Sequence, residues 1–230
     1  MAEWHDDCEL FRLMREELFT AVVGDVLDAM GLLAQFLPAE IRLLDEQKML
    51  VGRAMPVLEA DVSGAVAEGT ANPLSARPFG LMLEALDDLR PGEVYLCAGG
   101  SPDYARWGGL MSIRAMRLGA AGAVLDGPVR DTREIRALGF PVMARGRYAQ
   151  DQGPRGKVVD FRLPVRIGQA SIAPGDLLFG DIDGVLVVPR AVEEEAIHRA
   201  LEKVRGEDAV RRALEAGTSA AEAFRRFGVL

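Results

Sequence analysis

A cation and two carboxylates lie close together in the middle of the chain, at Arg130, Asp131 and Glu134. An arginine guanidinium binds a carboxylate through two parallel N–H donors, so Arg130 can hold the acidic end of a small substrate. Asp131 and Glu134 are three residues apart at the start of an expected short helix, so they share one face and can bind the same metal cation. These residues predict a small anionic substrate held next to a metal.

Two glycines, Gly108 and Gly109, precede these charges and stand in the first turn of an expected helix. The N–H groups at a helix start have no partner within the helix and carry the positive end of the helix dipole. Because glycine has no side chain to block the approach, a substrate carboxylate can reach them. The stretch from Gly99 to Glu134 therefore predicts an anion-binding helix start beside Arg130 and the two carboxylates.

These and similar residues also have purely structural interpretations, without a role in binding or catalysis. An isolated Arg-Asp-x-x-Glu sequence is also found as a surface ion-pair cluster. Asp25 and Asp28 form a similar carboxylate pair without a glycine turn or an arginine, so a helix cap or a solvated face explains them better, and packing between subunits is the other route by which one of them could reach a site. His5 and His198 lie in helical surroundings without sequence partners, which favours solvated or capping roles over metal binding.

The composition narrows the class of protein. The chain has 230 residues, 49% of them hydrophobic and 27% charged, with a formal net charge of -8, which is typical of a soluble globular protein. The acidic balance, without a basic stripe, argues against nucleic-acid binding. No apolar run approaches the roughly 20 residues of a membrane span, and the first residues do not resemble a secretory signal. We expect a cytoplasmic protein that binds no membrane, with Cys8 and Cys97 as reduced thiols.

Apolar periodicity and turn residues predict the outer elements. A strand pair is expected near residues 50–60, where Gly52 and Pro56 limit which residues can pair in the centre of a sheet. Residues 61–77 are expected to form a loop that is long enough to suggest a function. After Arg145, short strands punctuated by glycine and proline predict an all-β portion, whose Asp181-Ile182-Asp183-Gly184 turn lacks the further ligands of a calcium loop. Helices are expected at 6–19, 20–30, 78–89, 191–214 and 220–227, giving N-terminal helices at about 6–31 and C-terminal helices at about 191–227.

The central elements predict a pair of parallel strands joined by a helix. Strands are expected at 93–98, 122–126 and 140–144, with helices after the Gly99–Gly100 turn and at 132–138. The strands at 122–126 and 140–144 form the expected parallel pair, with a right-handed crossover through the helix at 132–138. The charged residues then lie at the carboxyl ends of the strands, where α/β sheets usually bind ligands. On the helix after the turn, we expect an apolar core stripe of Trp107, Leu110, Met111 and Leu118, and arginines facing solvent or a partner subunit at 106, 114 and 117. Tyr104 and Trp107 suit either a pocket wall or the core.

Three sequence motifs together resemble the RraA family. They are LPAEIR, GGLMSIRAMRLGAAGAVLDGPVRD and PGDLLFGDIDGVLVVPR, and the similarity runs from about Thr20 to the C-terminus. The family includes class II pyruvate aldolases acting on 4-hydroxy-4-methyl-2-oxoglutarate and 4-carboxy-4-hydroxy-2-oxoadipate. The resemblance implies one RraA-like domain over residues 1–230, an α/β fold of the swivelling α/β/β sandwich type, and a homotrimer or hexamer with sites between subunits.

The resemblance also assigns roles to the residues singled out above. It implies that Arg130 binds the carboxylate and carbonyl of a pyruvate-like substrate and that Asp131 helps hold a divalent metal, commonly Mg²⁺ or Mn²⁺. The amides of Leu110 and Met111 would meet the substrate carboxylate. In many family aldolases a carboxylate from the neighbouring subunit's C-terminal helix enters the site, and here Glu207 or Asp208 could take that place.

One position departs from the commoner aldolase pattern of the family. Many of its aldolases have an aspartate where this chain has Gly109. A second family pattern has glycine there and an acidic residue three positions after the aspartate of the Arg-Asp pair, and Glu134 fits this pattern. The second pattern is associated with oxaloacetate decarboxylation, so both that reaction and aldol cleavage are expected possibilities.

Both reactions pass through the same intermediate. A 2-oxo acid chelates a hard cation, which stabilises the negative charge that develops on the carbonyl oxygen, and either cleavage leaves a pyruvate enolate. No Schiff base is needed, since the lysines at 48, 157 and 203 lie outside the motif. The alternative is a non-catalytic regulator that binds ribonuclease E-type protein partners, as some RraA-family proteins do. The presence of Arg130, Asp131 and Glu134 favours an enzyme over this regulator, because a protein interface has no evident need for these three residues together.

Overall fold

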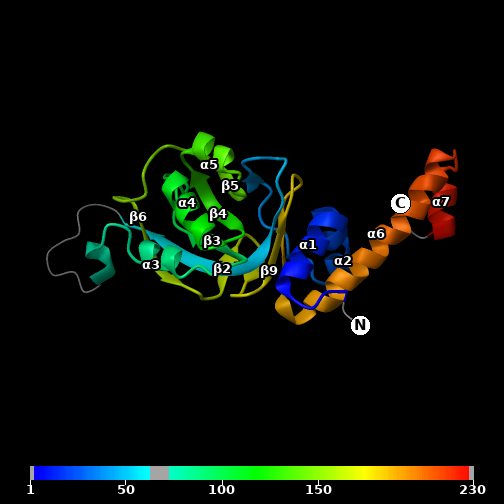
Figure 1. Cartoon of the computed structure of the whole chain (residues 1–230), viewed down its shortest axis with the longest axis horizontal. Coiled ribbons are helices and arrows are strands. Elements are labelled where there is room, and N and C mark those ends of the chain that lie inside the picture. Colours follow the sequence, from blue (N-terminus) through cyan, green and yellow to red (C-terminus); the bar gives the residue numbers. More distant parts are fainter. Residues whose placement is uncertain (1–2, 63–72, 228–230) are drawn as a thin grey trace.

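The computed structural model describes residues 3–62 and 73–227, so most of the loop expected at 61–77 lies outside the described residues. Figure 1 shows a sheet-centred body at one end of the molecule and the terminal helices at the other. Among the described residues, no helix has the length and apolar character needed to cross a membrane.

A mixed sheet of eight described strands forms the centre of the body. The strands are β1 (Arg42–Leu43), β2 (Leu50–Asp61), β3 (Glu93–Gly99), β4 (Gly122–Val129), β5 (Val142–Arg147), β6 (Gly156–Phe161), β9 (Leu177–Gly180) and β10 (Val185–Val188). The run β2, β3, β4 and β5 pairs in parallel, and within it the pairing of β4 with β5 confirms the predicted parallel pair. Antiparallel strands flank it, with β1 beside β5, and β9 and β6 beside β2.

The prediction of a strand pair near residues 50–60 is wrong, because β2 is one 12-residue strand in the middle of the sheet. Pro56 is tolerated there since β2 changes its antiparallel partner at this point. Residues 50–53 pair with β9, and residues 57–61 pair with β6, so Pro56 falls in the gap between the two ladders. A proline without an N–H donor costs least at such a break.

The two faces of the sheet are covered differently, as alternation along β3 shows. Tyr95 and Cys97 face a core shared with α3 (Met82–Asp87), α4 (Gly109–Arg117) and α5 (Thr132–Leu138). Val94 and Leu96 face a second core shared with the hairpin of β7 (Val165–Ile167) and β8 (Ala170–Ile172). Because side chains alternate along a strand, one sheet holds a helical layer on one face and a β layer on the other.

The helix expected at 78–89 is shorter than predicted, because α3 begins only at Met82. Gly80 has a positive φ of 63° and forms a bridge with Val158 of β6. A Cβ at Gly80 would lie 2.2 Å from the Val158 carbonyl oxygen, so the backbones approach too closely for any other residue. Residues 79–81 therefore pair with β6 before the helix starts.

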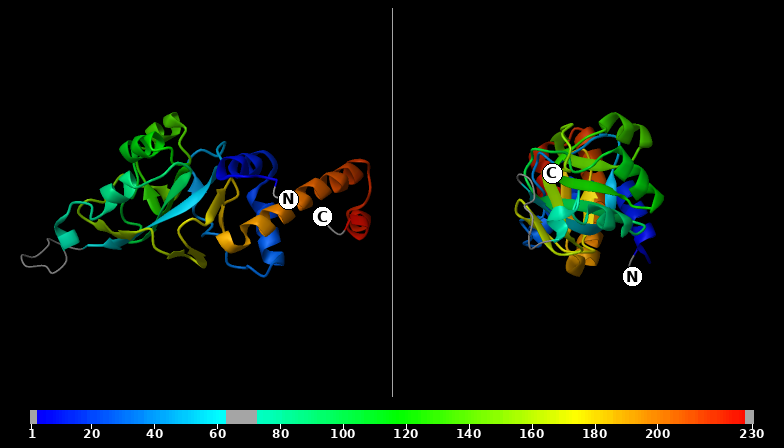
Figure 2. Two further views of the ribbon diagram at one scale, coloured as in Figure 1. Left: turned by 60° about the horizontal axis from the view of Figure 1, so that its bottom comes forward. Right: turned by 90° about the vertical axis from the view of Figure 1, so that its left-hand side faces the viewer.

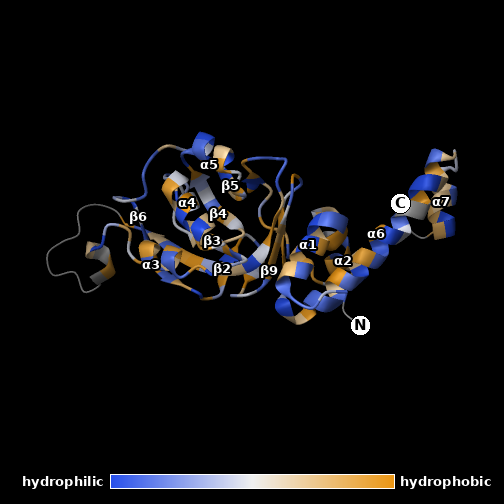
Figure 3. Ribbon diagram, viewed as in Figure 1, coloured by the Kyte–Doolittle hydropathy of each residue, from blue (hydrophilic) through white to orange (hydrophobic). Residues whose placement is uncertain are grey.

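The terminal helices pack on one another beyond the sheet. They are α1 (Asp7–Glu17), α2 (Thr20–Ala29), α6 (Glu193–Glu215) and α7 (Ala220–Phe227), close to the predicted bounds, with short 3-10 turns at Pro73–Ala76 and Arg190–Val192. Asp181 accepts hydrogen bonds of 2.7 Å from the N–H and the hydroxyl of Thr20 at the start of α2, so it serves as a cap. Figure 2 shows α6 extending away from the sheet, and Figure 3 shows polar residues over much of its surface.

Candidate active site

The start of α4 is the centre of the site. Gly108 is extended and offers no side-chain cap to the helix. Instead, the carboxylate of Asp131, from the end of β4, accepts the Gly109 N–H at 3.0 Å. Among the described residues, the N–H groups of Leu110 and Met111 have no backbone partner, as expected for a first helical turn. The helix start thus binds one carboxylate already and leaves donors for another.

The backbone of Asp131 is held in an unusual conformation. Its φ of 58° lies in the left-handed region, which aspartate tolerates better than most residues but which is uncommon outside glycine. Asp131 is also the residue directly before α5, so this turn sends the chain into that helix. Strained residues gather at ligand sites, and here the strain directs the carboxylate towards α4.

Arg130 is held from two sides. Its backbone N–H donates to the Trp107 carbonyl at 3.0 Å, which ties it to the residue before the two glycines. Its Nη1 lies 2.9 Å from Asp151 Oδ1, and its Nε lies 3.9 Å from Asp131 Oδ2. The side chain is 41% exposed, so the guanidinium remains open to a ligand.

Asp151 is a site residue that the sequence analysis missed. Its second carboxylate oxygen accepts the Gly153 N–H at 3.0 Å, which fixes the carboxylate that faces Arg130. The Asp-x-Gly spacing is a turn signal that could have indicated an ordered aspartate, but nothing in the sequence places it beside Arg130.

Glu134 fills the space that a side chain at position 109 would need. A Cβ at Gly109 would lie 2.0 Å from Glu134 Oε2, and a Cβ at Gly108 would lie 2.7 Å from Asp131 Oδ2. The two glycines and the two carboxylates therefore fit each other. This packing gives a physical reason for glycine at 109 in a chain that carries Glu134.

Two of the side-chain placements expected on this segment are wrong. Arg106 does not face solvent, because its side chain is fully buried and its Nε lies 3.7 Å from the buried carboxylate of Glu59. Leu110 is not in the core, because it is 80% exposed at the rim of the site. Trp107 is buried as expected, with its ring nitrogen donating to Ser112 Oγ at 2.7 Å. The helix begins at Gly109, so Arg106 precedes it and the helical pattern did not apply.

A polar cluster lies buried behind the site. Glu59 accepts a hydrogen bond from the Cys97 thiol at 3.2 Å and faces Arg106, whose Nη2 donates to the Ser101 carbonyl at 3.0 Å. Burial raises the pKa of Glu59 to about 7, although the positive charge of Arg106 opposes the shift. Glu59 Oε1 and two Arg106 nitrogens are buried without hydrogen-bond partners.

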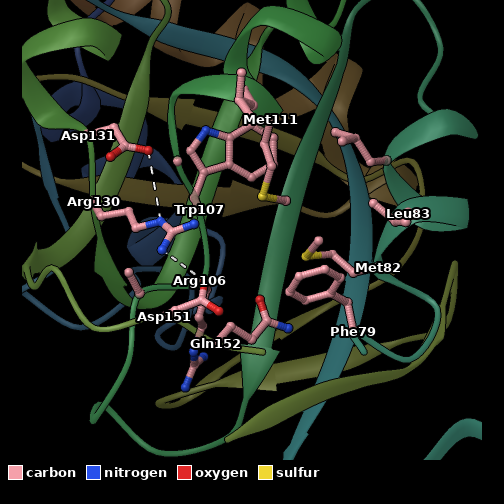
Figure 4. Close-up of a pocket in the computed structure, with 14 residues that line it drawn as sticks. Phe79, Met82, Leu83, Arg106, Trp107, Met111, Arg130, Asp131, Asp151 and Gln152 are labelled. Atoms are coloured by element: carbon pink, nitrogen blue, oxygen red, sulfur yellow. Dashed lines mark ion pairs between the residues drawn. The ribbon is translucent and has the colours of Figure 1, made fainter. Parts of the chain in front are cut away.

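A cavity of about 270 Å³ opens beside Arg130 and the start of α4. Figure 4 shows Arg130 between Asp131 and Asp151 at one side of the cavity and apolar side chains at the other. The described lining residues are Phe79, Met82, Leu83, Leu86, Ala105, Arg106, Trp107, Gly108, Leu110, Met111, Arg130, Asp131, Asp151 and Gln152. The cavity therefore joins a charged end to an apolar chamber.

The remaining candidates lie apart from this cavity. Asp25 pairs with Lys203 at 2.5 Å, which fits the expected solvated face, and the His198 ring stacks on Trp4 at 4.8 Å. Glu207 and Asp208 are on α6, which Figure 1 shows on the far side of the molecule from α4. The side chain of Asp208 is outside the described part of the chain.

The carboxylates suit a hard divalent cation. Asp131 and Glu134 close over adjacent glycines, and both offer oxygen ligands. Among the described residues, no group of three or more histidine, cysteine, aspartate or glutamate side chains could hold a metal. Mg²⁺ commonly uses one or two carboxylates and keeps water and substrate oxygens as its other ligands, so this donor set fits it.

Together, the fold and the site define an α/β protein with a cavity beside an arginine and a helix start at the carboxyl ends of parallel strands. The family described as RraA-like (Aldolase/RraA) matches residues 20–187, so the chain belongs to the RraA-like family.

The similar proteins include relatives with aldolase names. A protein of Halalkalibacterium halodurans named "Putative 4-hydroxy-4-methyl-2-oxoglutarate aldolase" is 31% identical over 206 residues, covering 89% of each chain. A protein of Thermus thermophilus named 4-hydroxy-4-methyl-2-oxoglutarate aldolase is 28% identical over 155 residues, covering 59% of this chain and 94% of its own.

Among solved structures, Streptomyces coelicolor RraAS2 is similar in fold and sequence. It is described as an unusual member of the RNase ES inhibitor RraA protein family. It aligns with a TM-score of 0.75 at 26% identity, covering 90% of this chain and 98% of its own. These matches confirm the expected RraA-like α/β fold.

Proposed function

We propose that the protein is a divalent-metal-dependent carbon–carbon lyase that acts on 2-oxo acids through a pyruvate enolate. The observation that carries the proposal is the Asp131 carboxylate bound to the Gly109 N–H beside Arg130. It places a helix start, a cation and carboxylates around one small space. The aldolase names of the relatives support the same class of reaction.

The chain's own residues bind and orient the substrate. The free N–H groups of Leu110 and Met111 donate to the substrate carboxylate, and Arg130 binds it together with the adjacent carbonyl oxygen. Asp151 holds the guanidinium in place from the other side. As the bond between C3 and C4 breaks, charge grows on the carbonyl oxygen, and Arg130 complements that charge.

Asp131 and Glu134 would hold Mg²⁺ or Mn²⁺, which supplies Lewis-acid stabilisation of the negative charge on the substrate's carbonyl oxygen. The glycine at 109 with Glu134 against it matches the pattern associated with oxaloacetate decarboxylation. Decarboxylation of oxaloacetate and aldol cleavage of a 4-hydroxy-2-oxo acid therefore both belong to the proposal.

The proposal includes a homotrimer or hexamer with sites between subunits. Four exposed apolar side chains lie on α3 and α4, and two of them also line the cavity. They are Leu83 and Leu110 at the cavity, and Ile113 and Met116 further along α4. Contiguous apolar surface next to a site is typical of an interface. Since α6 is distant from the cavity within one chain, Glu207 or Asp208 would act as an acid or base only in a neighbouring subunit's site.

The test is pyruvate release from oxaloacetate and from 4-hydroxy-4-methyl-2-oxoglutarate, with Mg²⁺ or Mn²⁺ and then with EDTA. Turnover should need the metal and should be lost in Arg130→Ala and Asp131→Ala. Arg136→Ala is the matched control, because Arg136 is exposed in the last turn of α5. Pyruvate release no faster than with free metal alone would refute the proposal.

A second candidate function is a regulator that binds a ribonuclease E-type protein. The similarity to RraAS2 over most of both chains favours it, and so does the acidic net charge of -8. A pull-down with such a ribonuclease tests it. Binding unaffected by Arg130→Ala, in a protein without lyase activity, would favour the regulator.

A further inference from the structure

The apolar chamber of the cavity lies on the side away from the charged residues. Phe79, Met82 and Leu83 form one wall, and Trp107 and Met111 form the other (Figure 4). A 2-oxo acid held by Arg130 and the start of α4 would extend its distal end between these walls. The chamber therefore contacts the part of the substrate beyond the breaking bond.

Among the described lining residues, none offers an available positive charge to the chamber. Arg130 is paired with Asp151 at the charged end. Arg106 is fully buried and paired with Glu59, and Figure 4 shows its guanidinium beyond Gln152, away from Phe79 and Met82. A second carboxylate in the chamber would lose its hydration without gaining a cation, which is costly.

Gln152 supplies the chamber with a neutral polar group. The residue is only 4% exposed, and its Nε2 is buried without a hydrogen-bond partner. Figure 4 shows its amide directed towards Phe79, into the chamber. An unpaired buried donor carries a free-energy penalty, so a ligand oxygen that accepts from it gains affinity.

We propose that, among 4-hydroxy-2-oxo acids, this chamber favours those with an uncharged, apolar distal end, and that Gln152 binds the substrate by donating to the oxygen on C4. This inference rests on the proposed lyase function. In the cleavage, the C4 hydroxyl gives its proton to a base, for which Glu207 or Asp208 of a neighbouring subunit is the proposed candidate, and becomes a carbonyl as the C3–C4 bond breaks. The electron pair stays on C3 as the pyruvate enolate, which a proton then converts to pyruvate. Gln152 would donate to the oxygen on C4 throughout.

The first experiment compares two matched substrates in the presence of Mg²⁺. One is 4-hydroxy-4-methyl-2-oxoglutarate, and the other is 4-hydroxy-4,5-dimethyl-2-oxohexanoate, in which an isopropyl group of similar size replaces the distal carboxylate. We expect kcat/KM to be about 10-fold or more higher for the apolar substrate. Equal or higher kcat/KM for the dicarboxylate overturns the inference.

A binding experiment separates failure of the inference from failure of the lyase function. It measures Kd for 2-oxoglutarate and for 5-methyl-2-oxohexanoate, which have no hydroxyl on C4 and cannot be cleaved. Tighter binding of 5-methyl-2-oxohexanoate supports the chamber's selectivity, and tighter binding of 2-oxoglutarate overturns it, whether or not any substrate releases pyruvate. Absence of pyruvate release from both cleavable substrates would instead refute the lyase function.

Two variants test the named residues. Gln152→Leu should lower kcat/KM for 4-hydroxy-4,5-dimethyl-2-oxohexanoate about 3- to 10-fold, the range of a neutral hydrogen bond, and leave Kd for 5-methyl-2-oxohexanoate unchanged. Equal losses for both ligands would show a merely structural role and overturn the assignment. Leu83→Arg, at a rim position that is 55% exposed, should shift preference towards the dicarboxylate, with Leu83→Gln as control. An unshifted preference would count against the chamber as the specificity site.

Discussion

Replacing Glu59 by glutamine should change how the stability of the protein depends on pH. Burial raises the pKa of Glu59 from an ordinary value of 4.5 to about 7 in the folded protein. Below pH 4.5 the carboxyl is protonated in both folded and unfolded chains. Between pH 4.5 and 7 only the unfolded chain ionises readily, so the free energy of unfolding falls as pH rises. At about 1.4 kcal/mol per pH unit, Glu59 accounts for a loss of about 3 kcal/mol by pH 7.

The assay is urea unfolding at several pH values between 4.5 and 8, followed by tryptophan fluorescence, since Trp107 is buried. The free energy of unfolding of Glu59→Gln, relative to wild type, should rise with pH by about 3 kcal/mol and level off above pH 7. Glu16→Gln, at an exposed glutamate, is the control and should follow the wild-type curve. Parallel curves for Glu59→Gln and wild type would refute the reasoning.

Three further predictions concern the site and the fold. Gly109→Ala places a Cβ 2.0 Å from Glu134 Oε2 and should push that carboxylate away. Mg²⁺ binding measured by calorimetry should then weaken about 10-fold, and adding Glu134→Ala to this variant should cause no further loss. Arg130→Lys keeps the charge but loses the two-donor geometry, so kcat/KM for pyruvate release should fall about 100-fold; a change below threefold would contradict the proposed role. Thr20→Val removes the hydroxyl hydrogen bond to buried Asp181 but keeps the one from the backbone N–H, and it should cost about 2 kcal/mol in urea unfolding; an unchanged free energy of unfolding would contradict the capping role of Asp181.

The sequence indicated the parallel strands and the terminal helices because their apolar patterns are local. It also indicated that Gly109, Arg130, Asp131 and Glu134 lie close together, because parallel strands end at one edge of a sheet. The sequence reasoning expected a substrate carboxylate at this helix start, and the structure places the Asp131 carboxylate on the Gly109 N–H. These features could be predicted because elements that follow one another in the sequence also lie side by side in the fold.

The sequence could not indicate contacts between distant segments. Arg106 pairs with Glu59, and Arg130 pairs with Asp151, across segments that no periodicity connects. An arginine next to a tryptophan in a loop gives no sign of being buried, because long charged side chains are usually exposed. Pro56 argued against a central strand, and only the change of partner along β2 explains why it is tolerated.

The position of the two arginines decides what the cavity can recognise. Arg106 and Arg130 both line the same cavity, but of the two only Arg130 is half-exposed. Arg106 is fully buried and pairs with Glu59, and it lies beyond Gln152 as seen from the chamber (Figure 4). A cation at each end would suit a dicarboxylate, whereas one cation, a neutral amide and apolar walls suit a monocarboxylate with an apolar tail. Since Glu59 has its pKa raised to about 7, it gains negative charge as pH rises through that value. The pairing that withholds Arg106 from a ligand should therefore strengthen with pH, and preference for the apolar substrate should strengthen with it.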